Sequence, residues 1–203
     1  MTSGNTTPGS RWSARQLALM AMFLALGTVL SFIEFPLLPG TDFLKYDAAN
    51  VPALLIGFAY GPLAGCIVAT LIPWLHSLFA GNPWGALMNT CIGIAYVLPS
   101  ALIYRASRRL SRRDSSSETD SASQSKKMSG NLGLIIGLAI GCVLAVGMAM
   151  VMNLLVTPIY TGAPLAAIKA MILPILLPFN VLKVLLNSVL GFLLMKSLHS
   201  FMT

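Results

Sequence analysis

The feature that most constrains this chain is a series of long apolar runs. They cover 14–33, 51–80, 84–104, 132–156 and 174–195, and they contain very few charged side chains. A run of about 20 residues is what a helix needs to cross the hydrocarbon core of a bilayer. The runs do not alternate between apolar and polar residues, as the strands of a membrane barrel do. Only 9% of the chain is charged, whereas soluble domains carry about 25%. The sequence therefore predicts an all-α membrane protein.

The run at 51–80 is too long for one span and is interrupted at Tyr60-Gly61-Pro62. Proline lacks a backbone donor and disfavours helix in the residue before it, so a helix boundary is expected there. Dividing the run gives six transmembrane helices within a membrane domain at 14–199. The predicted helices are 14–33, 51–60, 62–80, 84–104, 132–156 and 174–195.

The basic residues predict the orientation of these helices. Seven of the 13 lysines and arginines lie within 105–127, Arg11 and Arg15 precede the first helix, and Lys196 follows the last. With six spans these groups share one side, which the positive-inside rule makes the cytoplasm, so both termini are expected to be cytoplasmic. The same topology places the connections at 34–50, 81–83 and 157–172 together on the outer face. Residues 1–13 are predicted to be a disordered tail. The serine- and arginine-rich segment 105–131 is predicted to be a disordered cytoplasmic loop.

Several function classes lack support in the sequence. It contains no phosphate-binding GxxxxGK[ST] motif, no HExxH or GxSxG motif and no dinucleotide fingerprint. The three cysteines all lie inside apolar runs and form no ligand cluster. The basic residues mark topology and not a nucleic-acid surface. We therefore expect no enzyme activity, no ATPase within the chain, and no metal or cofactor.

Polar side chains at membrane depth are the best candidates for a binding site, because they are costly there and usually face a cavity or a partner. Asn180 and Lys183 are three residues apart and share a helix face. Asn153, Asn89 and Glu34 lie on other predicted helices or at their ends. Amides with one lysine and one carboxylate suit a planar heterocycle that has several carbonyl and ring-nitrogen edges.

Each of these residues also has a purely structural alternative. Lys183 could form an internal salt bridge, the asparagines could pack between helices, and Glu34 could pair with Lys45. Asp42 and Asp47 are typical of loop caps. His76, on the third predicted helix, is more typical of a core or interface histidine than of a ligand contact.

Two further stretches are informative. The segment 34–52 contains charged residues, aromatics and three prolines without helical periodicity, which predicts an ordered loop at the outer mouth of the bundle. On the first helix, Ala14, Ala18, Ala21 and Ala25 form small-xxx-small pairs that allow close approach of another helix. That helix could belong to this chain or to a partner.

Four motifs taken together resemble a known family. They are FxEFPLLPxxxFLKYDxxxVPALLxGFAYGPLAG, LHSLF, NxxIGxAYVLPSALIYR and PFNVLKVLL. The chain resembles the substrate-binding (S) components of energy-coupling-factor (ECF) vitamin transporters, and most closely the riboflavin-specific type. The resemblance covers about 14–105 and 150–195.

The resemblance implies a riboflavin site formed by Asn153, Asn180, Lys183 and Glu34. It also implies a role in ATP-driven vitamin uptake across the bacterial cytoplasmic membrane, with a transmembrane coupling subunit and two ATPase subunits as partners. The loop after the first helix would be a gate, and the alanines of that helix would dock the coupling subunit. The gating residues would be Phe43, Lys45, Tyr46 and Asp47.

The sequence departs from riboflavin-type components, as it has Ile72-Pro73 and Gly85-Ala86 where those have Lys-Asn and Gly-Glu. An S component for another vitamin or heterocycle is therefore one alternative. An intramembrane enzyme or an assembly subunit is an alternative from a different class.

Overall fold

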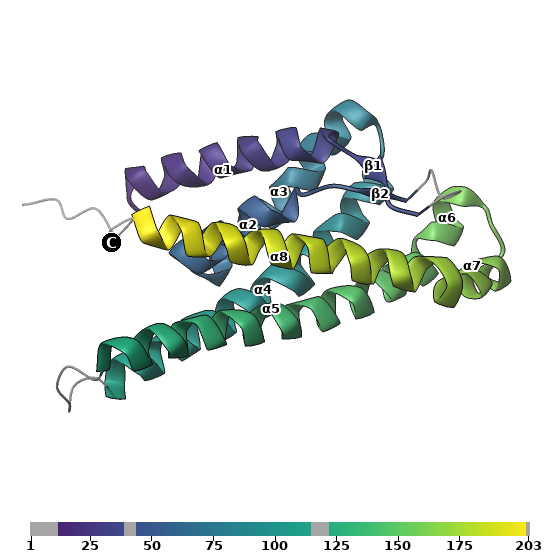
Figure 1. Cartoon of the computed structure of the whole chain (residues 1–203). Helices are drawn as coiled ribbons and strands as arrows, with labels where there is room; N and C mark the ends of the chain where they lie inside the picture. The colour runs from purple at the N-terminus through teal and green to yellow at the C-terminus, as the bar shows by residue number, and fades with distance from the viewer. Residues whose placement is uncertain (1–11, 39–43, 115–121, 202–203) are drawn as a thin grey trace, which may run out of the picture.

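The computed structural model describes residues 12–38, 44–114 and 122–201. Apart from its last two residues, the predicted N-terminal tail at 1–13 lies outside these ranges, as do Asp42 and Phe43. The described chain is helical, with one two-stranded antiparallel hairpin between the first two helices (Figure 1). The long elements are α1 (Ala14–Phe32), α2 (Asn50–Tyr60), α3 (Pro62–Ala80), α4 (Pro83–Asp114), α5 (Ala122–Leu155) and α8 (Leu177–Phe201). The short elements are β1 (Phe35–Pro36), β2 (Lys45–Tyr46), α6 (Thr157–Thr161), α7 (Leu165–Met171) and a π-helical turn, η1 (Ile172–Leu176).

Within the described residues, five helical segments are long and apolar enough to cross a membrane. They are Ala14–Phe32, Pro62–Ala80, Pro83–Leu110, Asn131–Thr161 and Leu165–Ser197. The apolar helix α2 has only 11 residues, about 16 Å at 1.5 Å per residue, so it is shorter than a usual span. The expected membrane character is thus present, while the sixth span and the orientation of the termini remain predictions.

Glycine, proline and serine determine several helix boundaries. Ser13 and Gln16 form a reciprocal capping box at the start of α1. Gly61 separates α2 from α3 with a φ of 106°, which residues with a side chain rarely adopt, and Pro62 begins α3. The expected break at Tyr60-Gly61-Pro62 is therefore confirmed.

The core lies around α2, whose residues from Val51 to Phe58 are all buried. Small residues bring its neighbours close. A Cβ atom at Gly65 of α3 would lie only 2.7 Å from the Cα of Gly57 on α2. Close packing of this kind without bulky side chains is typical of helices in membranes. Because of this close packing, α2 is enclosed by other helices of the protein. An enclosed position suits a helix that is too short to span the membrane.

The prediction of a disordered loop over 105–131 is wrong at both of its ends, where the described chain is helical. Helix α4 continues to Asp114 and α5 begins at Ala122, so helix occupies most of that range, and residues 115–121 lie outside the described part. Arginine has a high helix propensity, which allows the helix to continue where the apolar pattern stops. A prediction based on charge and serine content alone therefore placed the end of α4 too early and the start of α5 too late.

The bundle has two distinct ends (Figure 1). The start of α1, the end of α8, the end of α4 and the start of α5 lie at one end. The hairpin, α6 and α7 lie at the other end, which we call the hairpin end. This grouping matters because the polar residues singled out from the sequence cluster at the hairpin end.

Candidate ligand-binding cavity

A cavity of about 420 Å³ opens at the hairpin end of the bundle. Its walls come from the C-terminal end of α1, the hairpin and the α3–α4 turn. The start of α4, the end of α5 and the start of α8 also contribute. The short elements α6, α7 and η1 contribute the rest of the wall. Segments distant in sequence thus converge on one site of a size typical of small-molecule pockets, about 300–1,000 Å³.

All five predicted ligand-binding residues line this cavity: Glu34, Asn89, Asn153, Asn180 and Lys183. Asn153 and Asn180 are each 7% exposed, and each side-chain amide donates to a backbone carbonyl four residues earlier, Ala149 at 2.8 Å and Leu176 at 2.7 Å. These bonds orient both amides at the cavity wall. The structure therefore brings the predicted residues together, while their contact with a ligand stays a prediction.

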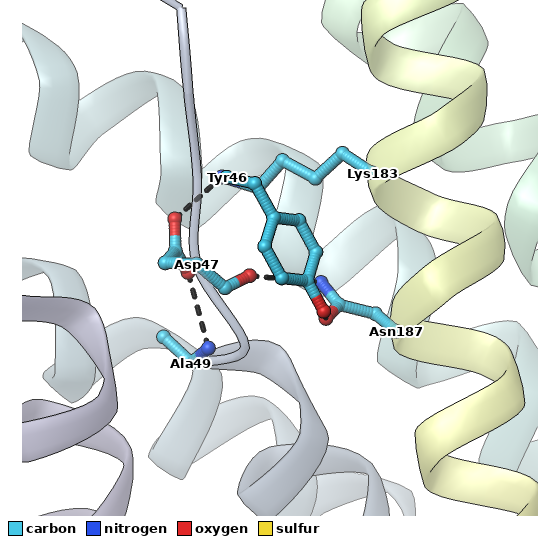
Figure 2. Close-up of polar contacts among 5 residues, drawn as sticks. All are labelled: Tyr46, Asp47, Ala49, Lys183 and Asn187. Carbon is cyan, nitrogen blue, oxygen red and sulfur yellow. Dashed lines mark hydrogen bonds and ion pairs between the residues drawn. The ribbon is translucent and has the colours of Figure 1, made fainter. Parts of the chain in front are cut away.

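Lys183 forms an ion pair with Asp47 across the cavity wall. Its Nζ donates to Asp47 Oδ2 at 2.6 Å, and the two side chains are only 13% and 17% exposed. The structural alternative for Lys183, an internal salt bridge, is thus present. Asp47 was predicted to be a loop cap, and its Oδ1 does accept from the Ala49 backbone N–H at 3.0 Å. It has the additional role of counter-ion to a residue of α8 (Figure 2).

Glu34 and Lys45 form a second ion pair at the rim, beside the antiparallel strands β1 and β2. Their side chains are 33% and 46% exposed, so solvent screens this pair more than the inner one. Of the two roles considered for Glu34, the pairing with Lys45 is present. Glu34 also lines the cavity and so stays a candidate for ligand contact.

Tyr46 anchors the hairpin to α8. It is 6% exposed, and its hydroxyl donates to Asn187 Oδ1 at 3.1 Å. Burial, and then the nearby Asp47 carboxylate, raise the pKa of the Tyr46 phenol above its usual range. The phenol therefore stays protonated and remains a donor at neutral pH.

Several lining residues were not predicted from the sequence. His76, expected to be a core or interface residue, lines the cavity, and its ring centroid lies 4.6 Å from that of Phe32. Asn50, Asn82 and Tyr160 also line the wall. A signal for these residues did exist. They lie in or next to the predicted connections at 34–50, 81–83 and 157–172, which the six-helix topology places on the same side as Glu34.

The alanines proposed for docking lie elsewhere. Ala14, Ala18, Ala21 and Ala25 are all exposed on α1, and none of them lines the cavity. Of the two interpretations of these alanines, tight packing within the described chain is therefore not supported. Docking of a partner stays a prediction.

A family model described as "ECF transporter, substrate-specific component" matches residues 15–195. The chain belongs to this family. Members of the family are transporter components and not enzymes. The expectation drawn from the FLKYD and PFNVLK motifs is therefore confirmed at the level of the family.

Individual relatives of this S component are riboflavin transporters. RibU of Staphylococcus aureus (strain TCH60) is 37% identical over 95 residues, which is 46% of this chain and 50% of that protein. FmnP of Bacillus subtilis (strain 168) is 32% identical over 95 residues, 45% of this chain and 50% of that protein. These matches span about half the length of the curated relatives.

Solved structures cover nearly the whole chain. The S component of a bacterial ECF transporter aligns with a TM-score of 0.67 and 29% identity, covering 93% of this chain and 98% of the other. ThiT from Listeria monocytogenes aligns with a TM-score of 0.60 and 17% identity, covering 90% and 94% of the two chains. The ThiT alignment supports the S-component fold alone.

Proposed function

We propose that this S component binds riboflavin with high affinity and delivers it for uptake through an ATP-driven ECF transporter in the bacterial cytoplasmic membrane. The observation that carries the proposal is the convergence of Glu34, Asn89, Asn153, Asn180 and Lys183 on one cavity. Its relatives RibU and FmnP are riboflavin transporters, which favours this vitamin among planar heterocycles.

The chemistry of the cavity suits an isoalloxazine ring. Asparagine amides both donate and accept hydrogen bonds, as do the carbonyl and imide edges of the ring. Apolar lining residues such as Phe179, Leu176 and Ile92 provide contact for its flat faces. In this proposal Asn153, Asn180 and Lys183 meet the polar edge of the ring, and Glu34 accepts from it.

The hairpin is proposed to act as the gate. Strand β2 and the residues after it form one wall of the cavity, and Tyr46 and Asp47 hold that wall to α8. Entry of the vitamin then requires the hairpin segment to move, and its return encloses the ligand. Lys45 joins this movement through its pairing with Glu34. Phe43, also assigned to the gate, belongs to the segment outside the described residues.

ATP-driven transport in this proposal requires partners, because the given sequence contains no nucleotide-binding motif of its own. The proposed partners are a transmembrane coupling subunit and two ATPase subunits. The exposed alanines of α1 offer a surface that a partner helix can approach closely. The vitamin is cargo in this scheme, and no resident cofactor is proposed.

A binding measurement tests the proposal. The full chain, purified in detergent, is titrated with riboflavin while flavin fluorescence is followed, with thiamine and biotin as controls. Saturable quenching by riboflavin alone, at one site per chain, supports the proposal. Absence of riboflavin binding, or tighter binding of a different vitamin, would overturn the assignment of this vitamin.

One observation favours a second candidate, an S component for another flat heterocycle. The three positions where the sequence departs from riboflavin-type components, Ile72, Pro73 and Ala86, all line the cavity. Smaller and less polar side chains there alter the shape of the wall. The same titration with a panel of heterocyclic vitamins distinguishes the two candidates.

A further inference from the structure

The charges of the cavity occur as two ion pairs of different exposure. The charged lining residues are two lysines and two carboxylates: Lys45, Lys183, Glu34 and Asp47. Lys45 pairs with Glu34 at the rim, and Lys183 pairs with Asp47 deeper in the wall. None of the described lining residues is an arginine. The formal charge of the lining that the structure describes is therefore zero, although it contains two cations.

Asp47 is held firmly in its place beside Lys183. One carboxylate oxygen accepts from the Ala49 N–H, and the other accepts from Lys183 Nζ (Figure 2). Its backbone carbonyl accepts from Asn187 Nδ2 at 3.4 Å, and Asn187 in turn accepts from Tyr46. Two residues bind the carboxylate and a third binds the backbone of Asp47, so this carboxylate is a fixed counter-ion and not a mobile surface charge.

This arrangement determines what Lys183 can offer a ligand. An ammonium has three N–H donors, and Asp47 takes one of them. The lysine can still donate to a carbonyl or ring nitrogen, but its net charge is cancelled within 2.6 Å. A neutral, hydrogen-bonding ligand loses nothing by this cancellation. An anionic ligand loses the attraction that an unpaired, poorly solvated cation would exert.

We propose that Asp47 is a specificity-determining residue that neutralises Lys183 and thereby makes the cavity select the neutral vitamin over its phosphate ester. The inference rests on the proposed function, since it needs the vitamin to occupy this cavity. It assigns to Asp47 a role separate from shaping the gate. Asp47 acts on the ligand through Lys183 and need not touch it.

The Asp47→Asn variant tests the inference directly. Asparagine keeps the shape of the side chain and an oxygen acceptor for Ala49, but leaves the charge of Lys183 uncompensated. The readout is the ratio of dissociation constants for riboflavin and riboflavin 5′-phosphate, measured on the full chain in detergent at fixed ionic strength. We expect the ratio to shift about tenfold toward the phosphate, as attraction over roughly 10 Å in a partly screened site allows.

Three further variants serve as controls for the charge of Asp47. Glu34→Gln removes one carboxylate from the exposed pair and should shift the ratio much less, because Lys45 is 46% exposed and solvent-screened. Lys183→Gln leaves Asp47 unpaired and should move the ratio in the opposite direction, further against the phosphate. It also provides a readout if Asp47→Asn does not fold. The double variant Asp47→Asn/Lys183→Gln should return the ratio toward that of the wild type.

The outcomes separate the inference from the proposed function. If the wild-type protein binds no riboflavin, both fail. If it binds riboflavin but Asp47→Asn lowers affinity for the neutral and phosphorylated forms equally, Asp47 is only a structural clasp and the inference is wrong. An equal shift in Glu34→Gln would also overturn it, because net charge alone would then explain the effect.

Discussion

At the residue scale, the buried asparagines are the most informative side chains of the cavity. The sequence identified Asn153 and Asn180 because an amide within an apolar helix needs a partner. Each amide donates to a backbone carbonyl four residues earlier, a bond that a helix-packing amide would also form. The structure adds that both lie at the cavity, so a ligand role and a structural role coincide in one side chain.

Asn153→Ala should weaken riboflavin binding by about tenfold, since one hydrogen bond to a neutral group is typically worth about 1 kcal/mol and an unpaired ligand group costs more. The matched control is Asn131→Ala, the same substitution in an exposed position near the other end of α5. Riboflavin titrations of the two variants compare them directly. Equal affinities in the two variants would remove Asn153 from the site.

Some residue roles could not have been read from the sequence. The pairing of Asp47 with Lys183 joins residues 136 positions apart, and nothing in either local pattern specifies it. The local pattern around Asp47 predicted a loop cap, and Lys183 was predicted to need an acceptor that no pattern identified. Only the fold shows that Asp47 is the acceptor of Lys183.

At the element scale, periodicity and turn chemistry located the apolar helices well. The boundary at Gly61-Pro62 is as predicted because glycine and proline restrict the backbone locally. The polar ends of α4 and α5 were missed, since the prediction relied on the loss of apolar residues and not on helix propensity. The interrupted helix around η1 was also not anticipated, although Pro174 and Pro178 mark that stretch.

Glycines let α4 and α5 pack closely, and this contact can be tested with a matched pair of substitutions. A Cβ atom at Gly141 would overlap the Ser100 hydroxyl and lie 2.7 Å from the Tyr96 carbonyl oxygen. A Cβ atom at Gly147, on the same helix, would meet nothing within 4 Å. The two positions share a helix and differ in packing.

We expect Gly141→Val to destabilise the protein by a few kcal/mol, because overpacking a close helix contact forces the backbones apart. Gly147→Val should change the stability little, since a Cβ atom there meets nothing within 4 Å and valine is no less favourable than glycine in a helix. Thermal unfolding in detergent, followed by helical circular dichroism, gives both values. A wild-type melting temperature in Gly141→Val would contradict the proposed close contact.

At the scale of the whole molecule, composition alone established a helical membrane protein, and four motifs indicated the family. The cavity could not be derived from composition, because it exists only where the ends of distant helices meet. The topology did place the connections at 34–50, 81–83 and 157–172 together, which is why the predicted ligand residues converge. The number of spans depends on α2, which is short and enclosed, so hydropathy alone does not settle it.

The exposed alanine face of α1 makes a prediction that concerns the whole transporter. Ala21→Leu should reduce riboflavin uptake in cells that contain the complete ECF module, because a bulky side chain keeps a partner helix from close approach. Affinity of the isolated S component for riboflavin should not change, since Ala21 is exposed and distant from the cavity lining. We therefore expect Ala21→Leu to lower the rate of riboflavin uptake while the affinity for riboflavin is unchanged.

Ala139→Leu is the matched control, because Ala139 is an exposed alanine on α5, away from the proposed docking face. Leucine there should leave uptake unchanged, as a larger apolar side chain is tolerated where a helix faces lipid. Uptake of labelled riboflavin, normalised to the amount of S component in the membrane, provides the comparison. A similar loss of uptake in both variants would mean that bulk anywhere on the exposed surface impairs transport, and α1 would lose its assignment as the docking helix. A loss confined to Ala21→Leu, with riboflavin affinity retained, would place the coupling contact on α1 and separate it from the vitamin site at the hairpin end.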